Sequence, residues 1–458
     1  MKRAKTCGVI AASMILTATH LASAGNTDSF YFSDDAALTA GAVTATTNDA
    51  GAIWYNPAGL GANPRDQVKL SGTGFALRIR SVPNALTTTY PGTSASSSIG
   101  LSSVTFFATP NATAFVRNIN DGLSVGFGLF VTQLDTYSVS NQTSGSDPAM
   151  SGAKYQQRID VLDNTKLYHA GPAIGWQALP SLRVGASLFA TYGTESLSYQ
   201  YLQNVQNADG TAGYYDLEQT RGSYSYIGAR AQVGLQWTPA DDWHVGLVVR
   251  SPEFVIKSSQ DELDVYANYD PRLPPSVAQE FNEAVTKNAP IPALTVMNPA
   301  RIIASAATSL AMVGLKDAWV SAEIDYQTGV NNDSQQLVPV VNGRVGVRWQ
   351  TNEDLALGAG LFTDRSNLPN LQSAFGEKVN YYGISGGVTF SKPLEGKERS
   401  KRTGAAPSVT STFGCRYAIG LGQAITETND AVTNTFTLGR TSVIYHEIVP
   451  YIGAGVLF

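Results

Sequence analysis

The chain has 458 residues, a formal net charge of −5 and 43% hydrophobic residues, but only 15% of its residues are charged. The mildly acidic balance, without a basic cluster, argues against a nucleic-acid partner. Two cysteines are too few for a disulfide scaffold. No stretch beyond the N-terminal leader reaches the ~18 uninterrupted apolar residues of a membrane-spanning helix.

Residues 1–24 have the pattern of a signal peptide. Three basic residues precede an apolar run over residues 8–18, and Ala22-Ser23-Ala24 supplies the small residues of a cleavage site. We therefore expect an exported protein whose mature chain starts at Gly25 and keeps one cysteine, Cys415.

Residues 25–65 do not have the pattern of a strand. They are rich in Gly, Ala, Thr and Asp and end in Trp54-Tyr55-Asn56-Pro57-Ala58-Gly59-Leu60. A barrel of about fourteen strands encloses a lumen that is too wide for side chains alone to fill. We therefore predict that this segment forms a plug, or hatch, inside the barrel that follows it.

Residues 66–458 alternate between apolar and polar positions with a period of two, which is typical of strands. One register is apolar and the other carries arginines, and a charge facing lipid near the midplane costs ~2–4 kcal/mol. The apolar register must therefore face lipid. The chain is predicted to be all-β, a transmembrane antiparallel barrel with strands near 66–80, 101–117, 121–139, 164–178, 181–199, 221–238, 242–258, 298–312, 316–328, 341–351, 354–363, 378–391, 411–427 and 440–458.

The connections between these strands differ in length by parity. Those after strands 2, 4, 6, 8 and 10 are short, whereas those after the odd-numbered strands are long, the longest covering residues 259–297. Short periplasmic turns and long extracellular loops produce this difference in outer-membrane barrels. The connection near residues 392–410 departs from the rule, and the sequence gives no reason for it.

The last strand alternates to the final residue, Phe458. A terminal aromatic residue on such a strand fits recognition by the barrel-assembly machinery through strand addition. The expected surroundings are outer-membrane lipid, and we expect a monomer.

Several motifs resemble the FadL-type outer-membrane transporters of long-chain fatty acids and aromatic hydrocarbons. Asn56-Pro57-Ala58 resembles the hatch motif of that family, and Thr109-Pro110-Asn111-Ala112 followed by residues 121–128 is similar to its second and third strands. The resemblance implies a 14-stranded barrel with an N-terminal hatch that includes Trp54 and Tyr55. It also implies loop capture of a hydrophobic ligand, a lumenal binding pocket, and release through a hatch shift or a gap in the wall at the third strand.

Pro110 and Pro172 fall in the second and fourth strands, on either side of a third strand that contains Gly126 and Gly128. Proline has no N–H to donate to a ladder. We hypothesise that these residues weaken pairing around the third strand and permit a lateral opening. The alternative is that each proline lies at an ordinary bulge.

Two sets of residues are candidates for ligand binding. In the longest loop, Val277, Phe281 and Val285 share one face of an expected amphipathic helix. This helix would face a capture groove or pack on the barrel rim. In the lumen, positively charged and imidazole side chains could meet a carboxylate head group; they are Arg230, Arg250, Arg344 and His244. The alternative is that the arginines pair with lumenal acids such as Glu323 and Asp325.

Enzyme sites have little support. Gly383-Ile384-Ser385-Gly386-Gly387 matches a nucleophile-elbow pattern, but the chain continues as a strand where that motif needs a helix. The three histidines after the leader are not in metal-ligand spacing, so we expect no metal and no cofactor. A porin for small polar solutes and, less favoured, an outer-membrane lipid hydrolase remain the alternative functions.

Overall fold

The computed structural model describes residues 31–62, 65–89, 96–147, 152–269, 279–287, 290–315, 317–369, 371, 376–394, 406–430 and 435–458. The predicted signal peptide and most of the 392–410 connection lie outside these residues. Among the described residues, no helix has the length and apolar character needed to cross a membrane.

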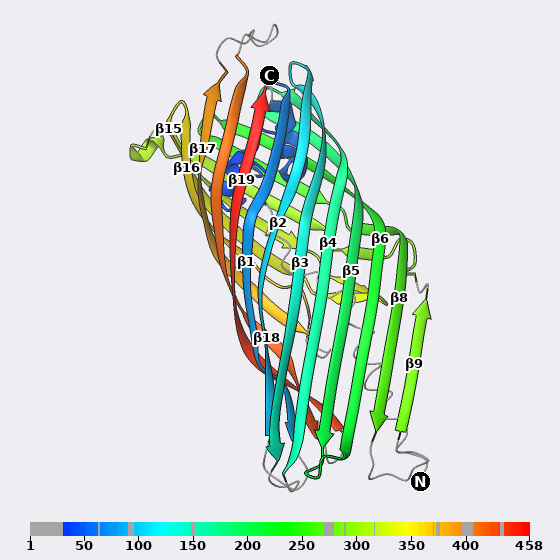
Figure 1. The fold of residues 1–458 in the computed structure, drawn as a ribbon. Helices are drawn as coiled ribbons and strands as arrows, with labels where there is room; N and C mark the ends of the chain where they lie inside the picture. The colour runs from blue at the N-terminus through cyan, green and yellow to red at the C-terminus, as the bar shows by residue number, and fades with distance from the viewer. Residues whose placement is uncertain are drawn as a thin grey trace.

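The described strands form one large sheet that closes on itself (Figure 1). Neighbours in sequence pair in antiparallel fashion, and the ring is closed where β1 pairs with β19 from Gln67↔Leu457 to Ile79↔His446. The strands of this sheet are β1 (Gln67–Thr89), β2 (Ser96–Asn120), β3 (Leu123–Asp147), β4 (Ala153–Leu179), β5 (Leu182–Gln206), β6 (Ala212–Ala240), β7 (Trp243–Arg250), β8 (Glu253–Tyr269), β9 (Gln279–Lys287), β10 (Val296–Asn298), β11 (Arg301–Ser309), β12 (Ala318–Gln327), β15 (Val340–Asn352), β16 (Leu355–Asp364), β17 (Glu377–Pro393), β18 (Ser408–Asp430) and β19 (Thr435–Leu457).

The predicted barrel is confirmed, and each of its fourteen segments overlaps a strand of the wall. Two segments are interrupted: Ser251 and Pro252 separate β7 from β8, and Pro299 and Ala300 separate β10 from β11. Proline cannot donate to a ladder, which explains a break at both positions. Strands β13 (Val330–Asn332) and β14 (Gln335–Leu337) form a separate small hairpin.

The wall is much taller on one side than on the other. Strands β11, β12 and β16 have 9 to 10 residues, which is about the length that crosses a bilayer. Strands β1 to β6 have 23 to 29 residues. The additional residues of these long strands extend toward the end that carries the longer loops, the lower end of Figure 1. Short connections, such as those at 121–122, 180–181 and 353–354, identify the opposite end as periplasmic.

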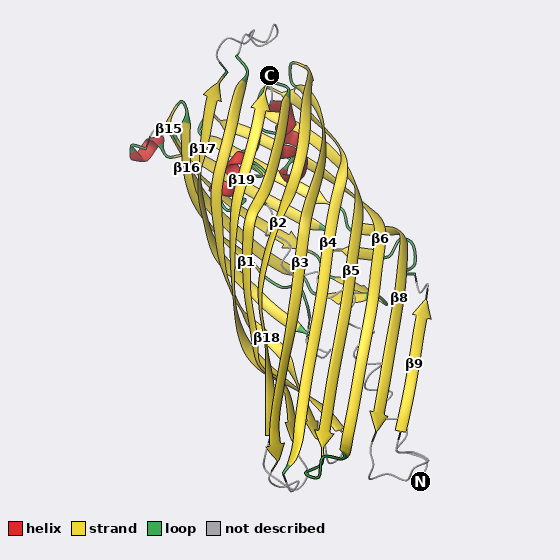
Figure 2. Ribbon diagram, in the orientation of Figure 1, coloured by secondary structure: helices red, strands yellow, loops and turns green. Residues whose placement is uncertain are grey.

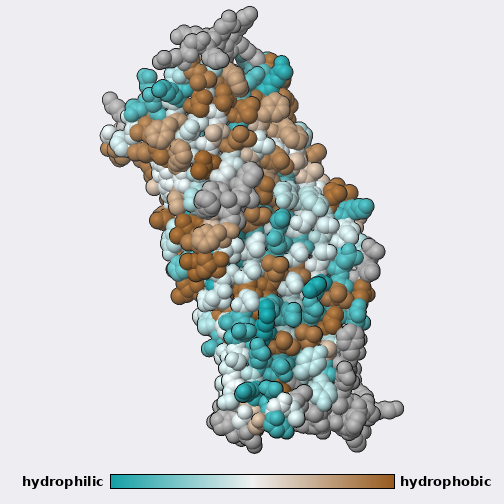
Figure 3. Space-filling view, viewed as in Figure 1, coloured by the Kyte–Doolittle hydropathy of each residue, from teal (hydrophilic) through white to brown (hydrophobic). Residues whose placement is uncertain are grey.

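The outward register is apolar around the periplasmic half of the wall. Leu129, Leu247 and Ile324 are 42%, 40% and 60% exposed although they are large and apolar. Four tryptophans lie exposed near the short turns, as in an interfacial aromatic girdle: Trp176, Trp237, Trp243 and Trp349. Figure 3 shows apolar residues gathered over the upper part of the visible face and hydrophilic residues toward its lower end. This outer band has the character expected of a surface that meets lipid.

The predicted amphipathic helix in the longest loop is wrong. Residues 279–287 form strand β9, which pairs with the outer part of β8 from Asp261↔Lys287 to Tyr269↔Gln279. The reason is that β8 extends beyond the low wall and offers an edge whose hydrogen bonds the loop can satisfy. Val277 lies outside the described residues, as does the side chain of Phe281, and Val285 is exposed.

The lipid-facing assignment can be tested with two equally exposed residues. Leu247→Arg places a charge in the middle of the low wall and should reduce the free energy of unfolding in liposomes by ~2–4 kcal/mol. Val285→Arg places the same charge on β9, above the membrane, and should have no comparable effect. Urea unfolding followed by tryptophan fluorescence measures both. Equal losses for the two variants would contradict the position of the lipid band.

Candidate functional site: an arginine-lined pocket above the N-terminal segment

Residues 31–62 lie inside the barrel, near its periplasmic end (Figure 2). They form α2 (Asp34–Leu38), α3 (Ala52–Tyr55) and the 3-10 helix η1 (Pro57–Ala62). Helix α2 contacts β15 to β18, and η1 contacts β3 to β6, so the segment spans the lumen from one wall to the other. Its apolar side chains, including Phe32, Ile53 and Leu60, are fully buried.

Glycines in the inward register let the backbone of this segment lie directly against the wall. A Cβ at Gly234 would lie 1.9 Å from Asn56 Oδ1, and one at Gly185 would lie 2.3 Å from the carbonyl carbon of Pro57. Any larger residue would overlap these atoms. Other glycines that contact the segment in this way, which together we call the glycine collar, are Gly126, Gly175, Gly246, Gly346, Gly358 and Gly360.

Asn56, Pro57 and Ala58 lie at the closest approach of the segment to β6. The Asn56 amide donates to Thr44 O (2.8 Å) and to Leu235 O on β6 (3.0 Å), and its Oδ1 accepts from Ala58 N (3.1 Å). One side chain therefore joins two parts of the segment to the barrel wall. The sequence predicted these residues as part of the plug but not this bonding.

Charged side chains of the barrel hold the rest of the segment. Lys69 on β1 lies 2.8 Å from Asp34 and 2.5 Å from Asp49, and Arg348 on β15 lies 2.6 Å from Asp35. These pairs are on the periplasmic side of the segment. On the opposite side, Arg250 donates to Trp54 O (2.5 Å) and its guanidinium lies over the Trp54 ring at 4.7 Å.

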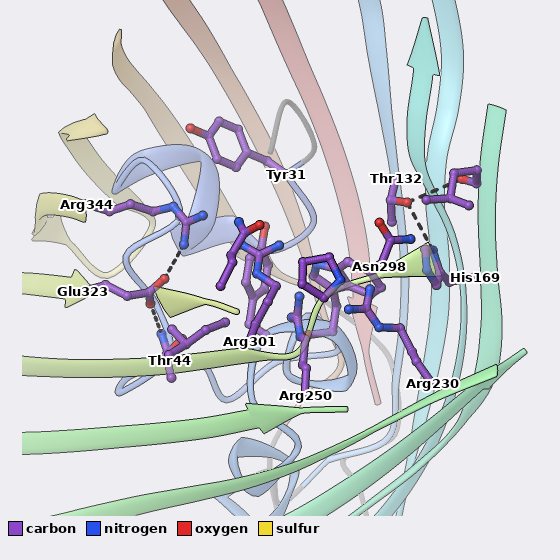
Figure 4. A pocket seen from close by; sticks show the side chains of 17 residues that line it. Tyr31, Thr44, Thr132, His169, Arg230, Arg250, Asn298, Arg301, Glu323 and Arg344 are labelled. Atoms are coloured by element: carbon purple, nitrogen blue, oxygen red, sulfur yellow. Dashed lines mark hydrogen bonds and ion pairs between the residues drawn. The ribbon is translucent and has the colours of Figure 1, made fainter. Parts of the chain in front are cut away.

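A pocket lies directly on the extracellular side of the segment (Figure 4). Tyr31, Trp54 and Tyr55 of the segment form part of its lining. The space that it encloses is about 60 Å³, room for a few water molecules. Four arginines from four strands of the wall complete the site, with His169 and Leu167 on β4: Arg230 (β6), Arg250 (β7), Arg301 (β11) and Arg344 (β15).

Two of the four arginines are neutralised by carboxylates of β12. Arg344 Nη1 lies 2.5 Å from Glu323 Oε1, and Arg301 pairs with Asp325. Glu323 also accepts a hydrogen bond from Thr44 N of the N-terminal segment (3.1 Å). For Arg344, the pairing with a lumenal acid is the one that the alternative interpretation of the sequence predicted.

Arg230 is placed differently. Its exposed fraction is 7%, its distance to Glu253 is 3.9 Å, and its Nε has no hydrogen-bond partner among the described residues. The Glu253 oxygens already accept four hydrogen bonds at 2.7 to 3.2 Å, donated by Tyr226, His169, Thr191 and Asn298. A buried guanidinium with spare donors is a ready partner for an anion.

The sequence did not single out Glu253, His169 or Arg301. Glu253 follows the Ser251–Pro252 break and His169 is on a different strand, so their contact depends on barrel register. Conversely, His244 is remote from the pocket lining; it bonds Thr238 Oγ1 (3.1 Å), and its ring lies 4.9 Å from that of Trp319.

The candidate residues for lateral opening lie around an incomplete ladder between β2 and β3. Among the residues that the structure describes, these strands pair from Ala112↔Phe130 to Asn120↔Leu123, at their periplasmic ends, and not beyond. Pro110 lies just beyond the last pair and beside a register shift in the β1–β2 ladder. Gly126 lies against Ile53 and Gly128 against Phe130.

Pro172 does not disturb the ladder with β3, where it pairs with Phe127. The β4–β5 ladder omits residues 171–172 but resumes in the same register at Ala173↔Ser187. Only Pro110 therefore coincides with the incomplete ladder.

Ser385 is an inward residue of β17. It lies in a strand, as the sequence predicted, and not in a nucleophile elbow.

Comparison with solved structures identifies the same fold in FadL-type channels. A Pseudomonas aeruginosa FadL homologue superposes with a TM-score of 0.54 over 90% of this chain and 95% of that chain, at 13% identity. A mutant of the TodX monoaromatic hydrocarbon channel gives 0.53 over 93% and 98%, also at 13% identity. The Ralstonia pickettii toluene transporter TbuX gives 0.50 over 93% and 97%, at 13% identity. No family model and no curated protein sequence matches the chain.

The FadL-like barrel implied by the sequence resemblance is therefore confirmed. A closed barrel with an apolar outer band and the fold of FadL-type channels is an integral outer-membrane protein.

The glycine collar provides a test of how tightly residues 31–62 fill the lumen. Gly185→Ala and Gly234→Ala should displace the segment, because overpacking of this kind costs ~1–3 kcal/mol. We expect higher ion conductance in planar bilayers and faster proteolysis of residues 31–62. Gly386→Ala is the matched control, since its Cβ would lie 3.4 Å from the nearest atom. Conductance at the wild-type level in both collar variants would contradict a closely fitted plug.

Proposed function

We propose that this protein carries hydrophobic molecules passively across the outer membrane. A barrel whose lumen is filled by residues 31–62, with a pocket lined by arginine and aromatic side chains directly above them, supports this function. The solved structures that share its fold include hydrocarbon channels and a toluene transporter. In this proposal residues 31–62 act as the hatch, with Asn56, Pro57 and Ala58 at its closest contact with the wall.

The pocket favours a hydrophobic molecule with an anionic head over a neutral hydrocarbon. The observation that carries this conclusion is the buried guanidinium of Arg230, whose Nε has no hydrogen-bond partner among the described residues and which lies 3.9 Å from Glu253, while Arg301 and Arg344 are closely paired. A carboxylate would accept two parallel hydrogen bonds from such a group. The rings of Trp54 and Tyr31 and the side chain of Leu167 line the same pocket and would contact the apolar chain.

The proposed route begins above the low wall. A buried apolar cluster lies there between β4, β6, β8 and β10, formed by Leu167, Tyr224, Tyr226, Val255 and Met297. Leu167 belongs both to this cluster and to the pocket lining, so apolar contact continues from one to the other. Release would then follow either a shift of the hatch or passage through the wall where the β2–β3 ladder is incomplete.

Replacement of Arg230 tests the head-group assignment. Arg230→Gln should weaken binding of dodecanoate by about tenfold or more, the loss expected for a charged hydrogen bond. Binding of dodecanol, which lacks the charge, should change little. Arg158→Gln, at an exposed pair with Asp160 on β4, is the control. Displacement of a fluorescent probe measures the affinities. If the wild-type protein binds dodecanoate and dodecanol with equal affinity, the pocket has no anion site.

Proteoliposomes test the transport function itself. The purified protein should accelerate transfer of dansyl-undecanoate to albumin enclosed inside the vesicles, while few ions or small sugars pass. Free passage of sugars would instead indicate the porin alternative. Release of fatty acid from a lipid ester, abolished by Ser385→Ala, would indicate the hydrolase alternative.

A further inference from the structure

The outer half of the β1–β2 hairpin lacks backbone pairing with the wall strand on either flank. On one side the β1–β19 ladder ends at Ile79↔His446, and on the other the β2–β3 ladder ends at Ala112↔Phe130. Within the described residues, the hairpin beyond these points regains a ladder only at its tip, where residues 86–89 pair in parallel with residues 427–430 of β18. We call residues 80–89 and 96–103 the flap.

The base of the flap bends at one level on both of its strands. The ladders of β1 with β2 and with β19 both shift register beyond Thr73, and the β1–β2 ladder also shifts between Ser71 and Gly72, beside Pro110. A bulge leaves a residue unpaired and bends the strand locally. Two bulged strands side by side form a hinge line, because neither continues a straight ladder through the bend.

Ion pairs cross the seam between the flap base and the wall. Arg78 lies 2.8 Å from Asp135 on β3 and 2.5 Å from Glu447 on β19, and Arg80 lies 2.6 Å from Asp135. Asp135 therefore joins β1 to β3 across β2, the strand that lacks a ladder with β3 at this height.

Side chains replace the missing backbone bonds along the seam. Thr105 Oγ1 donates to Thr136 O (3.0 Å), and Asn141 Nδ2 donates to Gly100 O (2.6 Å). The inner face of the flap packs into a buried apolar cluster with wall residues, to which Val82, Leu86, Ile99 and Leu101 contribute from the flap. Apart from the four-residue ladder with β18 at its tip, the flap is thus held to the wall by side-chain contacts, which separate more readily than a continuous ladder.

We propose that the flap is an outer gate of the barrel, latched by Asp135 to Arg78 and Arg80, and that its movement opens the β2–β3 seam. This proposal rests on the transport function proposed above, for which it supplies a moving part. Release of the latch frees the flap at its base, while the hinge line below it stays paired to the barrel. The apolar inner face of the flap then becomes accessible from outside.

The latch is tested without any transport measurement. In a Cys415→Ser background, Leu101→Cys places a thiol on the buried inner face, where its exposed fraction is 2%. Asp135→Asn should raise the rate of maleimide labelling of this thiol by about tenfold, the effect of a lost charged hydrogen bond. Asp160→Asn, at an exposed pair within β4, should leave the rate unchanged. Equal rates in the two variants would overturn the latch.

Cross-linking tests whether flap movement is needed for transport. Thr88 and Gln157 are hydrogen-bonded between flap and wall (2.6 Å), so cysteines there can be joined by a short bifunctional reagent. Ser81 and Ser102 are opposite each other within the hairpin (3.0 Å) and provide the matched control. We expect the first cross-link to abolish dansyl-undecanoate transfer and the second to preserve it. If transfer persists when the flap is cross-linked to the wall, the gate is overturned. If neither the wild type nor any cross-linked protein transfers dansyl-undecanoate, while Asp135→Asn still raises the labelling rate, the transport function is contradicted and the latch is not.

Discussion

The close contact between the N-terminal backbone and the glycine collar is the constraint on which the rest of the structure depends. A wall residue with a Cβ at Gly185 or Gly234 would overlap Pro57 or Asn56. Because the collar brings the segment against the wall, the lumen is filled at one level with little empty space. The same contact fixes the position of Trp54 and Tyr55, and so determines the floor of the pocket above them.

Charge balance in a poorly hydrated lumen determines the chemistry of that pocket. Buried charges are stable only when they are paired and hydrogen-bonded, and β12 supplies carboxylates to Arg301 and Arg344. Glu253 accepts four other hydrogen bonds and lies 3.9 Å from Arg230, whose Nε has no hydrogen-bond partner among the described residues. In the proposed function, an anionic head group would complete the charge balance at this arginine.

The unequal height of the wall separates the functional regions of the barrel. The low wall is little longer than the bilayer is thick, so the pocket is reached from its rim. On the tall side, long strands continue outside the membrane, and the β1–β2 hairpin departs there from both of its neighbours. The low rim and the β2–β3 seam are therefore the two different places at which the proposed transport would take a ligand past the wall.

The sequence alone determined the barrel, its strand positions and the face of each strand that meets lipid, because alternation with a period of two is a local property that the energy of lipid contact enforces. It failed at residues 279–287, where apolar spacing indicated a helix, since these residues pair with the edge of the preceding strand β8, which is free only because β8 extends beyond the low wall. Only the tertiary structure decided that Arg301 and Arg344 pair closely with carboxylates of β12, whereas Arg230 lies 3.9 Å from Glu253. Such pairings depend on barrel register, which brings together side chains far apart in the sequence, and no local pattern records it.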